Sequence, residues 1–173
     1  MEKSIRADRL ELHVPQPDEL WFRQKILSDP ATMAYNAPWF PPDGCIPFPE
    51  SAWDDFYAKW IGHRPDRFYA YLRRISDGAF VGEVDYRRTP GSDRWDIGVV
   101  VSADCRGLGY GMEGLRLLIE HAFLTDGVTC LQNDFETSRG AACRIHKVFG
   151  FRETGTKDGI IHLELTRDEF LTK

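Results

Sequence analysis

The chain has 173 residues, of which 42% are hydrophobic and 28% are charged. This length favours a single domain, residues 1–173, with a sizeable core of its own, and two domains are not expected. The net charge of −5 at pH 7 makes the surface a poor match for nucleic acid, so we expect no partner of that class.

Membrane and secreted proteins are also poor matches. No segment approaches the roughly 20 apolar residues of a membrane helix, and the opening residues Met1–Arg6 lack the apolar stretch of a signal peptide. The cysteines, Cys45, Cys105, Cys130 and Cys143, are scattered without a C-x-x-C pair, which favours reduced thiols over a disulfide framework or a metal site. We therefore expect a cytoplasmic protein with no membrane partner and no bound metal.

The first third of the chain predicts a strand, two helices and a long loop between those helices. Residues 9–14 alternate in polarity, as in a strand, and a helix is expected to follow over residues 17–28. Residues 37–49 contain five prolines, which exclude a regular helix or a central strand and predict a loop. Ser51 is then expected to cap a second helix, whose apolar residues recur with helical spacing over 53–61.

Three strands in hairpin order come next, at residues 68–75, 79–88 and 95–101. Turn-forming residues separate them, with Ser-Asp-Gly at 76–78 and Thr-Pro-Gly-Ser-Asp at 89–93. Short connections of this kind predict antiparallel pairing between consecutive strands.

A glycine-rich loop follows, with the sequence Cys-Arg-Gly-Leu-Gly-Tyr-Gly at residues 105–111. Its alternate glycines let the backbone approach a ligand, and the helix that follows offers unpaired N–H groups and the positive end of its dipole. A phosphate is the ligand that such a loop favours. The spacing is not that of the dinucleotide motif G-x-G-x-x-G, whose third glycine would fall on Met112, and it lacks the Gly-Lys-Ser/Thr of a P-loop.

The rest of the chain predicts two helices and three strands. The first helix spans about residues 112–123, and the second spans about 137–149 and ends at Gly150. The face that the second helix is expected to bury is formed by Ala141, Ala142, Ile145, Val148 and Phe149. The strands are expected at residues 128–135, 151–156 and 160–165.

The motif R-x-x-G-x-G, from Arg106 to Gly111, resembles the pyrophosphate-binding signature of the GNAT superfamily of acyl-CoA-dependent N-acyltransferases. The order of the expected strands and helices resembles the GNAT fold throughout. The opening strand, the first helix and Ser-Asp-Pro at 28–30 resemble the branch that includes the ribosomal-protein alanine acetyltransferases. The resemblance implies an α/β (α+β) fold with a central mixed, mostly antiparallel twisted sheet flanked by helices.

The last expected long helix carries a second resemblance. GNAT members commonly have Asn, then Ala or Ser, then Tyr, and finally Gly-Phe in this region. The corresponding residues here are Arg139, Ala142, His146 and Gly150-Phe151. Arg139 and His146 depart from the pattern, and the match gives little information on the substrate.

The resemblance implies acetyl-CoA as the cosubstrate. The main chain from Val99 to Val101 would pair with the pantetheine arm, and the N–H of Val101 would polarise the thioester carbonyl. The N–H groups from Arg106 through Met112 would hold the pyrophosphate, with the Arg106 side chain adding a charge-assisted contact. The residues that the resemblance assigns to the cofactor are Val99, Val101, Arg106, Gly107, Gly109, Gly111, Met112 and Arg139.

The chemistry itself sets the need for a base. An alkyl amine with a pKa of about 10.4 costs roughly 4 to 5 kcal/mol to deprotonate at pH ~7, whereas an α-amino group near 7.7 costs only about 1 kcal/mol. Glu83 is the leading candidate, on a strand that the family places near the acyl group, and Asp85 or a chain of water molecules is an alternative base. On sequence alone, it is equally consistent that Glu83, Asp85 and Arg87 form the solvated face of an antiparallel sheet.

His146 is the candidate for the acid that protonates the departing thiolate, because it falls at the family's Tyr position. It also lies at the border of an apolar stripe, between Ala142 and Phe149, so a packed histidine with one hydrogen bond is the alternative. The thiol that leaves has a pKa of about 8.5, so it departs partly as thiolate and the acid is expected to matter only modestly.

The expected function is that of an N-acetyltransferase, which moves an acetyl group from acetyl-CoA to a primary amine by direct attack, with a carboxylate base and a histidine acid. The amine would belong to a small molecule or to a peptide or protein N-terminus. A non-catalytic, acyl-CoA-binding GNAT-like sensor or interaction module is the alternative. The resemblance also leaves a homodimer open.

Overall fold

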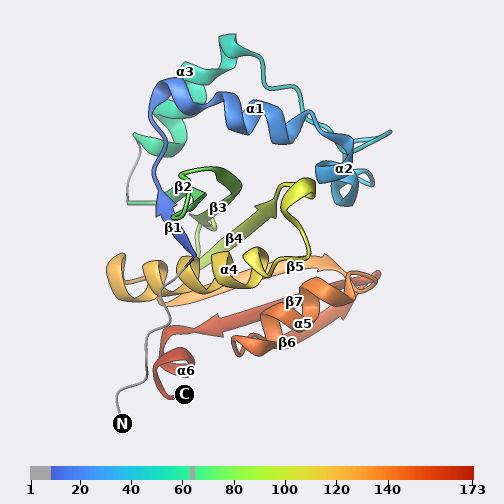
Figure 1. Ribbon diagram of the computed structural model, residues 1–173. Coiled ribbons are helices and arrows are strands. Elements are labelled where there is room, and N and C mark those ends of the chain that lie inside the picture. The colour runs from blue at the N-terminus through green and yellow to red at the C-terminus, as the bar shows by residue number, and fades with distance from the viewer. Residues whose placement is uncertain (1–8, 63–64) are drawn as a thin grey trace. The chain divides into compact units, whose positions relative to one another are not determined.

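The computed structural model describes residues 9–62 and 65–173, and Figure 1 shows how the strands and helices follow one another. Met1–Arg6, for which the sequence predicted no signal peptide, lie outside the described residues. Within the described residues, a seven-stranded sheet has the order β1-β2-β3-β4-β5-β7-β6. Its strands are β1 (Leu10–His13), β2 (Arg67–Arg74), β3 (Phe80–Arg88), β4 (Arg94–Val101), β5 (Cys130–Glu136), β6 (Arg152–Lys157) and β7 (Ile160–Thr166).

The sheet is mixed and mostly antiparallel, as predicted. β1 pairs with β2, and β7 pairs with both β5 and β6, in antiparallel orientation. Backbone bonds from Arg74 N to Ala79 O (2.7 Å) and from Thr89 N to Arg94 O (2.9 Å) close the turns that join β2, β3 and β4. The parallel ladder between β4 and β5 covers Arg94 to Asp96 on β4, and both strands continue beyond it.

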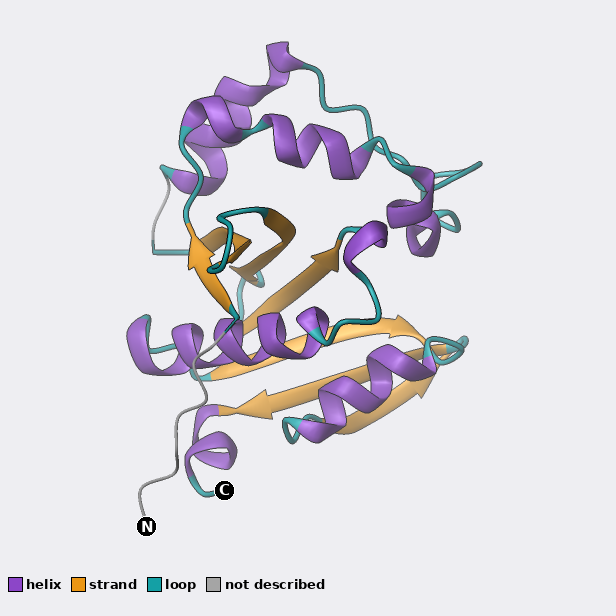
Figure 2. Cartoon of the chain, viewed as in Figure 1, coloured by secondary structure: helices purple, strands orange, loops and turns teal. Residues whose placement is uncertain are grey.

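Helices and turns join the strands, and Figure 2 shows the helices in purple. They are α1 (Trp21–Leu27), α2 (Pro30–Met33), α3 (Trp53–Phe56), α4 (Tyr110–Glu120), α5 (Gly140–Val148) and α6 (Arg167–Leu171). A 3-10 turn over Pro17–Glu19 precedes α1, so the helix predicted at 17–28 is confirmed in two parts. Residues 37–49 form neither helix nor strand, as their prolines predicted.

The second predicted helix runs from Glu50 to Ile61 but changes its hydrogen bonding along the way. It begins as a 3-10 turn, continues as α3 and ends as a π-helical turn. The prediction that Ser51 caps this helix is wrong. The turn begins one residue earlier, after Pro49, whose carbonyl oxygen accepts a hydrogen bond from Ala52 N at 2.8 Å, and the Ser51 side chain therefore lies inside the first turn.

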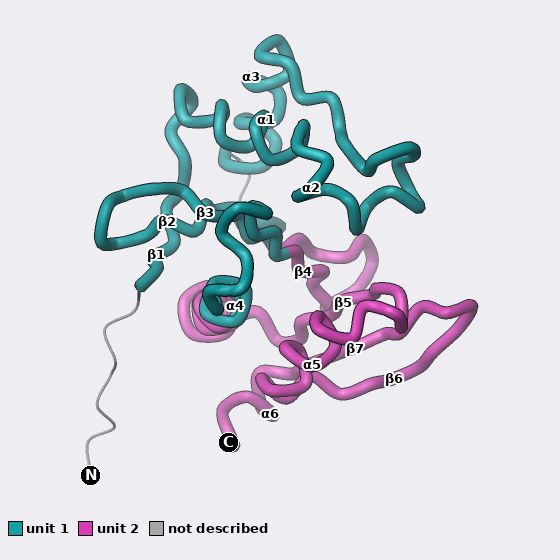
Figure 3. Tube along the Cα trace, turned by 45° about the vertical axis from the view of Figure 1, so that its right-hand side comes forward, with its two compact units in different colours: residues 1–85, 99–115 teal, residues 86–98, 116–173 magenta. Residues whose placement is uncertain are grey.

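The chain divides into two compact units, which Figure 3 shows in different colours. The first unit contains residues up to 85 and residues 99–115, and the second contains residues 86–98 and 116–173. β3, β4 and α4 each pass from one unit into the other.

Each unit has its own apolar core. In the first unit, the buried residues Phe22, Ile26, Tyr69 and Tyr71 pack with Phe56, Trp60, Ile61 and Phe80. In the second unit, buried apolar side chains come from α4, β5, β7 and the turn after α4, namely Leu118, Ile119, Phe123, Leu131, Leu163 and Leu165. Phe56 and Trp60, from the segment around α3, therefore pack against the core of the first unit.

α5 is shorter than the helix predicted there and turns a different side chain inward. The predicted burial of Val148 is wrong, since 63% of this residue is exposed, and Ala141 is exposed as well. The buried side chain of α5 is His146, whose ring lies 5.1 Å from the ring of Phe135 and 5.1 Å from the ring of Phe151. On α5, the polar residue His146 is therefore buried, whereas the aliphatic residue Val148, which was predicted to be buried, is exposed.

Local chemistry explains two helix ends in the second unit. Gly150 has a φ of +97°, a conformation that glycine adopts readily, and α5 ends before it as predicted. α6 was not predicted, although Thr166 and Glu169 form a capping box at its start. Across the described residues, no helix combines the length and the apolar character needed to cross a membrane.

Candidate active site

The glycine-rich loop leads from β4 into α4 with its backbone open on one side. Gly107 and Gly109 have φ values of +77° and +82°, which glycine adopts without strain. A Cβ added at Gly107 would meet no heavy atom within 4 Å. Within the described residues, the N–H groups from Gly107 to Met112 have no acceptor, and the first helical bond runs from Glu113 N to Gly109 O at 3.2 Å. The loop therefore presents a run of unpaired donors at the start of α4.

Arg106 fastens this loop to α2. Its guanidinium donates hydrogen bonds to the carbonyl oxygens of Ala31 (3.2 Å), Thr32 (2.8 Å) and Val101 (3.3 Å). Its backbone N–H donates to the carbonyl oxygen of Ala103 at 3.3 Å. Both the side chain and the N–H of Arg106 are thus engaged in shaping the loop.

Arg9 and Glu113 hold the other side of the loop, and neither residue was predicted to take part in the site. Arg9 donates to the Glu113 carboxylate through Nε (2.9 Å) and to the carbonyl oxygen of Leu108 through Nη1 (2.7 Å). Glu113 also accepts from the N–H groups of Arg9 (2.6 Å) and Leu10 (2.9 Å). Because Arg9 and Glu113 are 104 residues apart, no local sequence pattern signals the pair.

The valines predicted to contact the pantetheine arm lie at the end of β4, beside a glycine of β3. Val99 and Val101 are both partly buried. A Cβ added at Gly82 would lie 2.3 Å from the carbonyl oxygen of Val100 and 3.2 Å from Cα of Val101. Only glycine permits this close approach, so Gly82 fixes the backbone at the end of β4. Met112, in the first turn of α4, is 41% exposed.

Glu83, the candidate base, is buried in the first unit with only 6% of the residue exposed. Arg23 donates through Nη1 to both carboxylate oxygens, at 2.6 and 2.7 Å, and the hydroxyl of Tyr69 donates to Oε2. The alternative prediction, that Glu83 lies on the solvated face of an antiparallel sheet, is therefore wrong. Asp85, the alternative base, is only partly buried, and Arg87 is exposed.

Arg23 is held by aromatic rings as well as by charge. The carbon of its guanidinium lies 4.4 Å from the ring centre of Phe56, 5.3 Å from that of Phe48 and 5.5 Å from that of Tyr69. Burial acts to lower the pKa of Arg23, but the charges and hydrogen bonds of Glu83 and Tyr69 together outweigh burial, and the pKa is raised. Burial, followed by the charge of Glu83, raises the pKa of Tyr69. The cluster thus joins an ion pair, Arg23 with Glu83, to a tyrosine hydroxyl that stays protonated at neutral pH.

His146, the candidate acid, is a buried imidazole of the second unit with 6% of the residue exposed. Nδ1 lies 2.7 Å from the carbonyl oxygen of Ala142 and must donate to it, so in the neutral ring Nε2 accepts from the Asn133 amide at 3.0 Å. Burial lowers the pKa of His146; the bond to Ala142 opposes this shift, and the charge of Arg139 adds to it. The imidazole is therefore neutral at pH 7, with both nitrogens in hydrogen bonds.

Arg139 occupies the N-cap position of α5, and its guanidinium carbon lies 5.5 Å from the ring centre of Phe135. It belongs to the second unit together with His146, whereas Glu83, the end of β4 and the glycine-rich loop belong to the first. The structure thus places the predicted residues in two groups, each within its own unit.

An open groove of about 550 Å³ borders α1 in the first unit. Its volume is within the range of small-molecule sites. Its lining residues are Trp21, Gln24, Lys25, Ser28, Ile46, Pro47, Phe48 and Pro49. Lys25 is the charged residue of this lining, and Phe48 belongs both to the groove and to the set of rings around Arg23.

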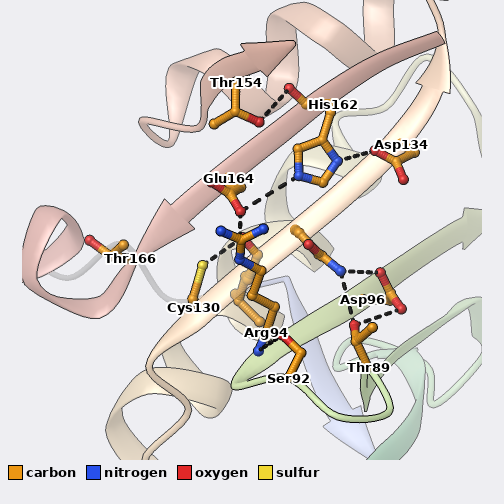
Figure 4. Close-up of polar contacts among 12 residues, drawn as sticks. Thr89, Ser92, Arg94, Asp96, Cys130, Asp134, Thr154, His162, Glu164 and Thr166 are labelled. Atoms are coloured by element: carbon orange, nitrogen blue, oxygen red, sulfur yellow. Dashed lines mark hydrogen bonds and ion pairs between the residues drawn. The ribbon is translucent and has the colours of Figure 1, made fainter. Parts of the chain in front are cut away.

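A second polar cluster spans β4, β5 and β7 in the second unit, and Figure 4 shows its side chains pointing toward one another. Gln132 donates through Nε2 to Thr89 and to Asp96, both at 2.9 Å, and Arg94 pairs with the buried Glu164 at 2.9 Å. None of the predicted site residues is among them, and the contacts join neighbouring strands. Among the described residues, no group of three or more His, Cys, Asp or Glu side chains could hold a metal ion.

Comparison with known proteins identifies the family. Residues 9–152 match the family model described as an acetyltransferase (GNAT) domain. No curated protein sequence matches the chain. The branch of the ribosomal-protein alanine acetyltransferases stays a prediction.

Solved structures share the fold at low sequence identity. An acetyltransferase (GNAT family) from Bacillus anthracis is 17% identical, with 95% of this chain and 98% of that chain covered and a TM-score of 0.74. A spermidine N-acetyltransferase from Vibrio cholerae, in complex with CoA and spermine, is 14% identical over 94% and 98% of the two chains, with a TM-score of 0.78. The N-acetyltransferase PseH from Campylobacter jejuni, in complex with acetyl coenzyme A, is 15% identical over 67% and 78%, with a TM-score of 0.57.

The mixed sheet, the order of its elements and the family match agree with one another. The family model covers most of the described residues, and the similar structures confirm the fold over nearly the whole chain. This chain therefore belongs to the GNAT family of acetyltransferases, as its sequence predicted.

Proposed function

We propose that this protein transfers an acetyl group from acetyl-CoA to a primary amine, carried by a small molecule or by a peptide or protein N-terminus. The observation that carries the proposal is the run of unpaired N–H groups from Gly107 to Met112, in a chain of the GNAT family. The two structures of similar fold that hold CoA or acetyl coenzyme A support this cosubstrate. We further propose that residues 1–173 act as one domain and that the protein works in the cytoplasm.

The loop fits the diphosphate of acetyl-CoA. The space beyond Gly107 is open, and the N-terminus of α4 favours an anion through its donors and its dipole. We assign the diphosphate to the backbone from Gly107 through Gly109 and Gly111 to Met112. Arg106 acts by holding the loop in shape, because its guanidinium already binds carbonyl oxygens.

The end of β4 fits the arm of the cosubstrate. The ladder with β5 covers β4 only as far as Asp96, before Val99 and Val101, which leaves main-chain groups of that part of β4 without a partner in the ladder. We propose that these groups pair with the pantetheine arm and that the N–H of Val101 polarises the reacting carbonyl. Arg139, at the start of α5, stays a predicted contact of the cofactor.

Acetyl-CoA supplies the thioester that the amine attacks. We propose that Glu83 accepts the proton that the nitrogen loses once it has added to the carbonyl. The bonds from Arg23 and Tyr69 hold the carboxylate of Glu83 in place. A carboxylate is a sufficient base at this stage, because an ammonium nitrogen next to a former carbonyl carbon is strongly acidic.

We propose that His146 acts as the acid for the departing thiolate only in its minor, protonated form, so its contribution is small. The imidazole is neutral near pH 7, and a thiol with a pKa of about 8.5 leaves readily without help. We expect His146→Phe to lower kcat by about tenfold or less, at or below the low end of the usual contribution of a general acid, about 10² to 10⁴. Full turnover with an unchanged pH dependence would remove His146 from the mechanism.

The first experiment measures CoA binding by calorimetry. We expect Gly111→Glu to abolish binding, because it adds bulk and a negative charge to the first turn of α4. Gly155→Glu, which makes the same change at an exposed position of β6, is the matched control and should bind like the natural protein. Undiminished affinity of Gly111→Glu would refute the assignment of the diphosphate.

The second experiment measures acetylation by mass spectrometry. Purified protein and acetyl-CoA are incubated with polyamines, aminoglycosides, amino acids and N-terminal peptides. Acetylation of a primary amine in any of these classes supports the proposal. Turnover of none of them would contradict it.

A second candidate function is favoured by one observation. Both oxygens of Glu83 and both ring nitrogens of His146 are already engaged in hydrogen bonds. That arrangement also fits a non-catalytic acyl-CoA-binding sensor or interaction module. Tight binding of acetyl-CoA without turnover of any acceptor would distinguish this function from the transferase.

A further inference from the structure

The guanidinium of Arg9 lies against the second half of the glycine-rich loop, where charge and an aromatic ring hold it. Its Nη1 donates to the carbonyl oxygen of Leu108 at 2.7 Å, and its Nε donates to Glu113 at 2.9 Å. Its carbon lies 4.9 Å from the ring centre of the buried Tyr110. A Cβ added at Gly109 would lie 3.1 Å from Nη2, so the guanidinium also lies close to the backbone there.

The bond to Leu108 fixes the direction of the N–H that follows it. A trans peptide unit is planar, and its C=O and N–H point in opposite directions. The peptide bond between Leu108 and Gly109 is trans. Because the carbonyl oxygen of this unit points at Arg9, the N–H of Gly109 points away from Arg9. In the part of the chain that the structure describes, this N–H has no acceptor, so it is available to a ligand on that side.

The same contact makes Gly109 a better donor. A cation that binds a carbonyl oxygen draws electron density through the peptide unit, and hydrogen bonds in a chain polarise one another. Gly109 has a φ of +82°, and it has no side chain that could cover its N–H. The guanidinium, the carbonyl of Leu108 and the N–H of Gly109 therefore form one chain of dipoles.

Arg9 also balances the charge of Glu113 in the first turn of α4. This carboxylate accepts from the N–H groups of Arg9 at 2.6 Å and Leu10 at 2.9 Å, as well as from Nε of Arg9. A negative charge at the start of a helix competes with an anionic ligand for the positive end of the dipole. The ion pair with Arg9 reduces that competition.

We propose that Arg9 is a positioning residue for acetyl-CoA, which orients the N–H of Gly109 toward the diphosphate through the carbonyl of Leu108. This inference rests on the proposed binding of the diphosphate by the loop. Arg106 holds the first half of the loop against α2, and Arg9 holds the second half against the start of β1. The donors are thus oriented before the ligand arrives, which reduces the cost of ordering them on binding.

The test replaces Arg9 with glutamine and measures CoA binding by calorimetry. The side-chain nitrogen of glutamine follows Cδ, as Nε does in arginine, so it can donate to Glu113 but is too short to reach Leu108. We expect Arg9→Gln to weaken CoA binding by about 10- to 100-fold, the usual effect of losing one hydrogen bond to a charged group.

Arg73→Gln is the matched control. Arg73 of β2 also binds a carboxylate through Nε, that of Glu11 on β1 at 2.7 Å. The control therefore removes the same charge and the same kind of ion pair, but it leaves Arg9 and its bond to Leu108 in place. It should bind CoA within about twofold of the natural protein, because single exposed ion pairs contribute little.

Amide NMR distinguishes orientation of one N–H from general stabilisation of the loop. In ligand-free Arg9→Gln, the amide resonance of Gly109 should move, because the preceding carbonyl has lost its donor. The shift that saturating CoA causes at Gly109 should become smaller, whereas Gly107, whose peptide unit Arg9 does not bind, should keep its shift. Pantetheine, which lacks the diphosphate, should shift residues 99–101 equally in Arg9→Gln and in the natural protein.

The outcomes are distinct. Undiminished CoA affinity of a folded Arg9→Gln protein would overturn the inference, and so would an equal loss of the CoA-induced shifts at Gly107 and Gly109. Weaker CoA binding with an unchanged Gly109 resonance would show that Arg9 acts by its charge alone, which would overturn the inference as well.

One measurement requires no variant to fold. In the natural protein, a scalar coupling across the hydrogen bond should join Nη1 of Arg9 to the carbonyl carbon of Leu108, and its absence would overturn the inference. Failure of the natural protein to bind CoA would instead contradict the proposed cosubstrate, and the inference would fall with it.

Discussion

Among single residues, His146 links the stability of the protein to pH. Burial lowers its pKa in the folded state below the ordinary value of about 6.5, so the unfolded chain binds this proton more readily. The contribution of His146 is therefore fully present above pH ~6.5 and is lost as the pH falls through the folded-state pKa. Each unit of pKa difference corresponds to about 1.4 kcal/mol.

The measurement is urea unfolding at several pH values from about 7.5 to 5. We expect the free energy of unfolding of the natural protein to fall more steeply with decreasing pH than that of His146→Gln, which has no group that titrates at this position. Parallel pH dependences of the two proteins would show that His146 is not linked to folding in this way.

Residues that act through local spacing were predicted, and those that act across long separations were not. The role of the alternate glycines in the loop could be predicted from the sequence, because their spacing alone determines where the backbone can adopt a positive φ. Arg23 and Glu83 are 60 residues apart, so nothing near Glu83 in sequence shows that its carboxylate is already paired. For the same reason, Glu83 was predicted as a base with no knowledge of the arginine that binds its carboxylate.

Among the elements, β3 and β4 depend on a single glycine for their close contact at the candidate site. A Cβ at Gly82 would lie 2.3 Å from a backbone oxygen of β4, which cannot rotate away. We expect Gly82→Ala to destabilise the protein by about 1 to 3 kcal/mol, the usual cost of overpacking, and to weaken CoA binding through the end of β4. Thermal unfolding and calorimetry provide the two measurements.

Gly155→Ala is the control for that substitution. Gly155 lies on β6 and has no φ in the left-handed range, and a Cβ added there would meet no heavy atom within 4 Å. The change in the free energy of unfolding should therefore be within about 0.5 kcal/mol. Equal stability and equal CoA affinity of the Gly82→Ala and Gly155→Ala proteins would contradict the importance of the β3–β4 contact.

The elements themselves followed from periodicity, and the differences lie at their ends. Every strand begins and ends within two residues of the range that alternation and turn residues predicted. The start at Glu50 and the π-helical turn after α3 could not be predicted. They depend on whether each backbone N–H bonds to the carbonyl oxygen three, four or five residues earlier, which the sequence pattern does not show. α6 could have been found from Thr166 and Glu169, whose spacing is that of a capping box.

At the scale of the whole molecule, three elements join the two compact units. β3, β4 and α4 each continue from one unit into the other, so unfolding either unit would break elements of its neighbour. We expect calorimetry to show one cooperative transition, with equal calorimetric and van't Hoff enthalpies, that CoA shifts to higher temperature. Two transitions, of which CoA moves only one, would contradict the proposal of a single domain.

The central claim is that backbone N–H groups of the glycine-rich loop bind the diphosphate of coenzyme A. Amide NMR spectra recorded with and without saturating CoA test it most directly. We expect large shifts for residues 99–112, foremost Gly107, Gly109 and Gly111, together with a higher melting temperature. Unchanged amide shifts in this segment and an unchanged melting temperature would contradict the claim.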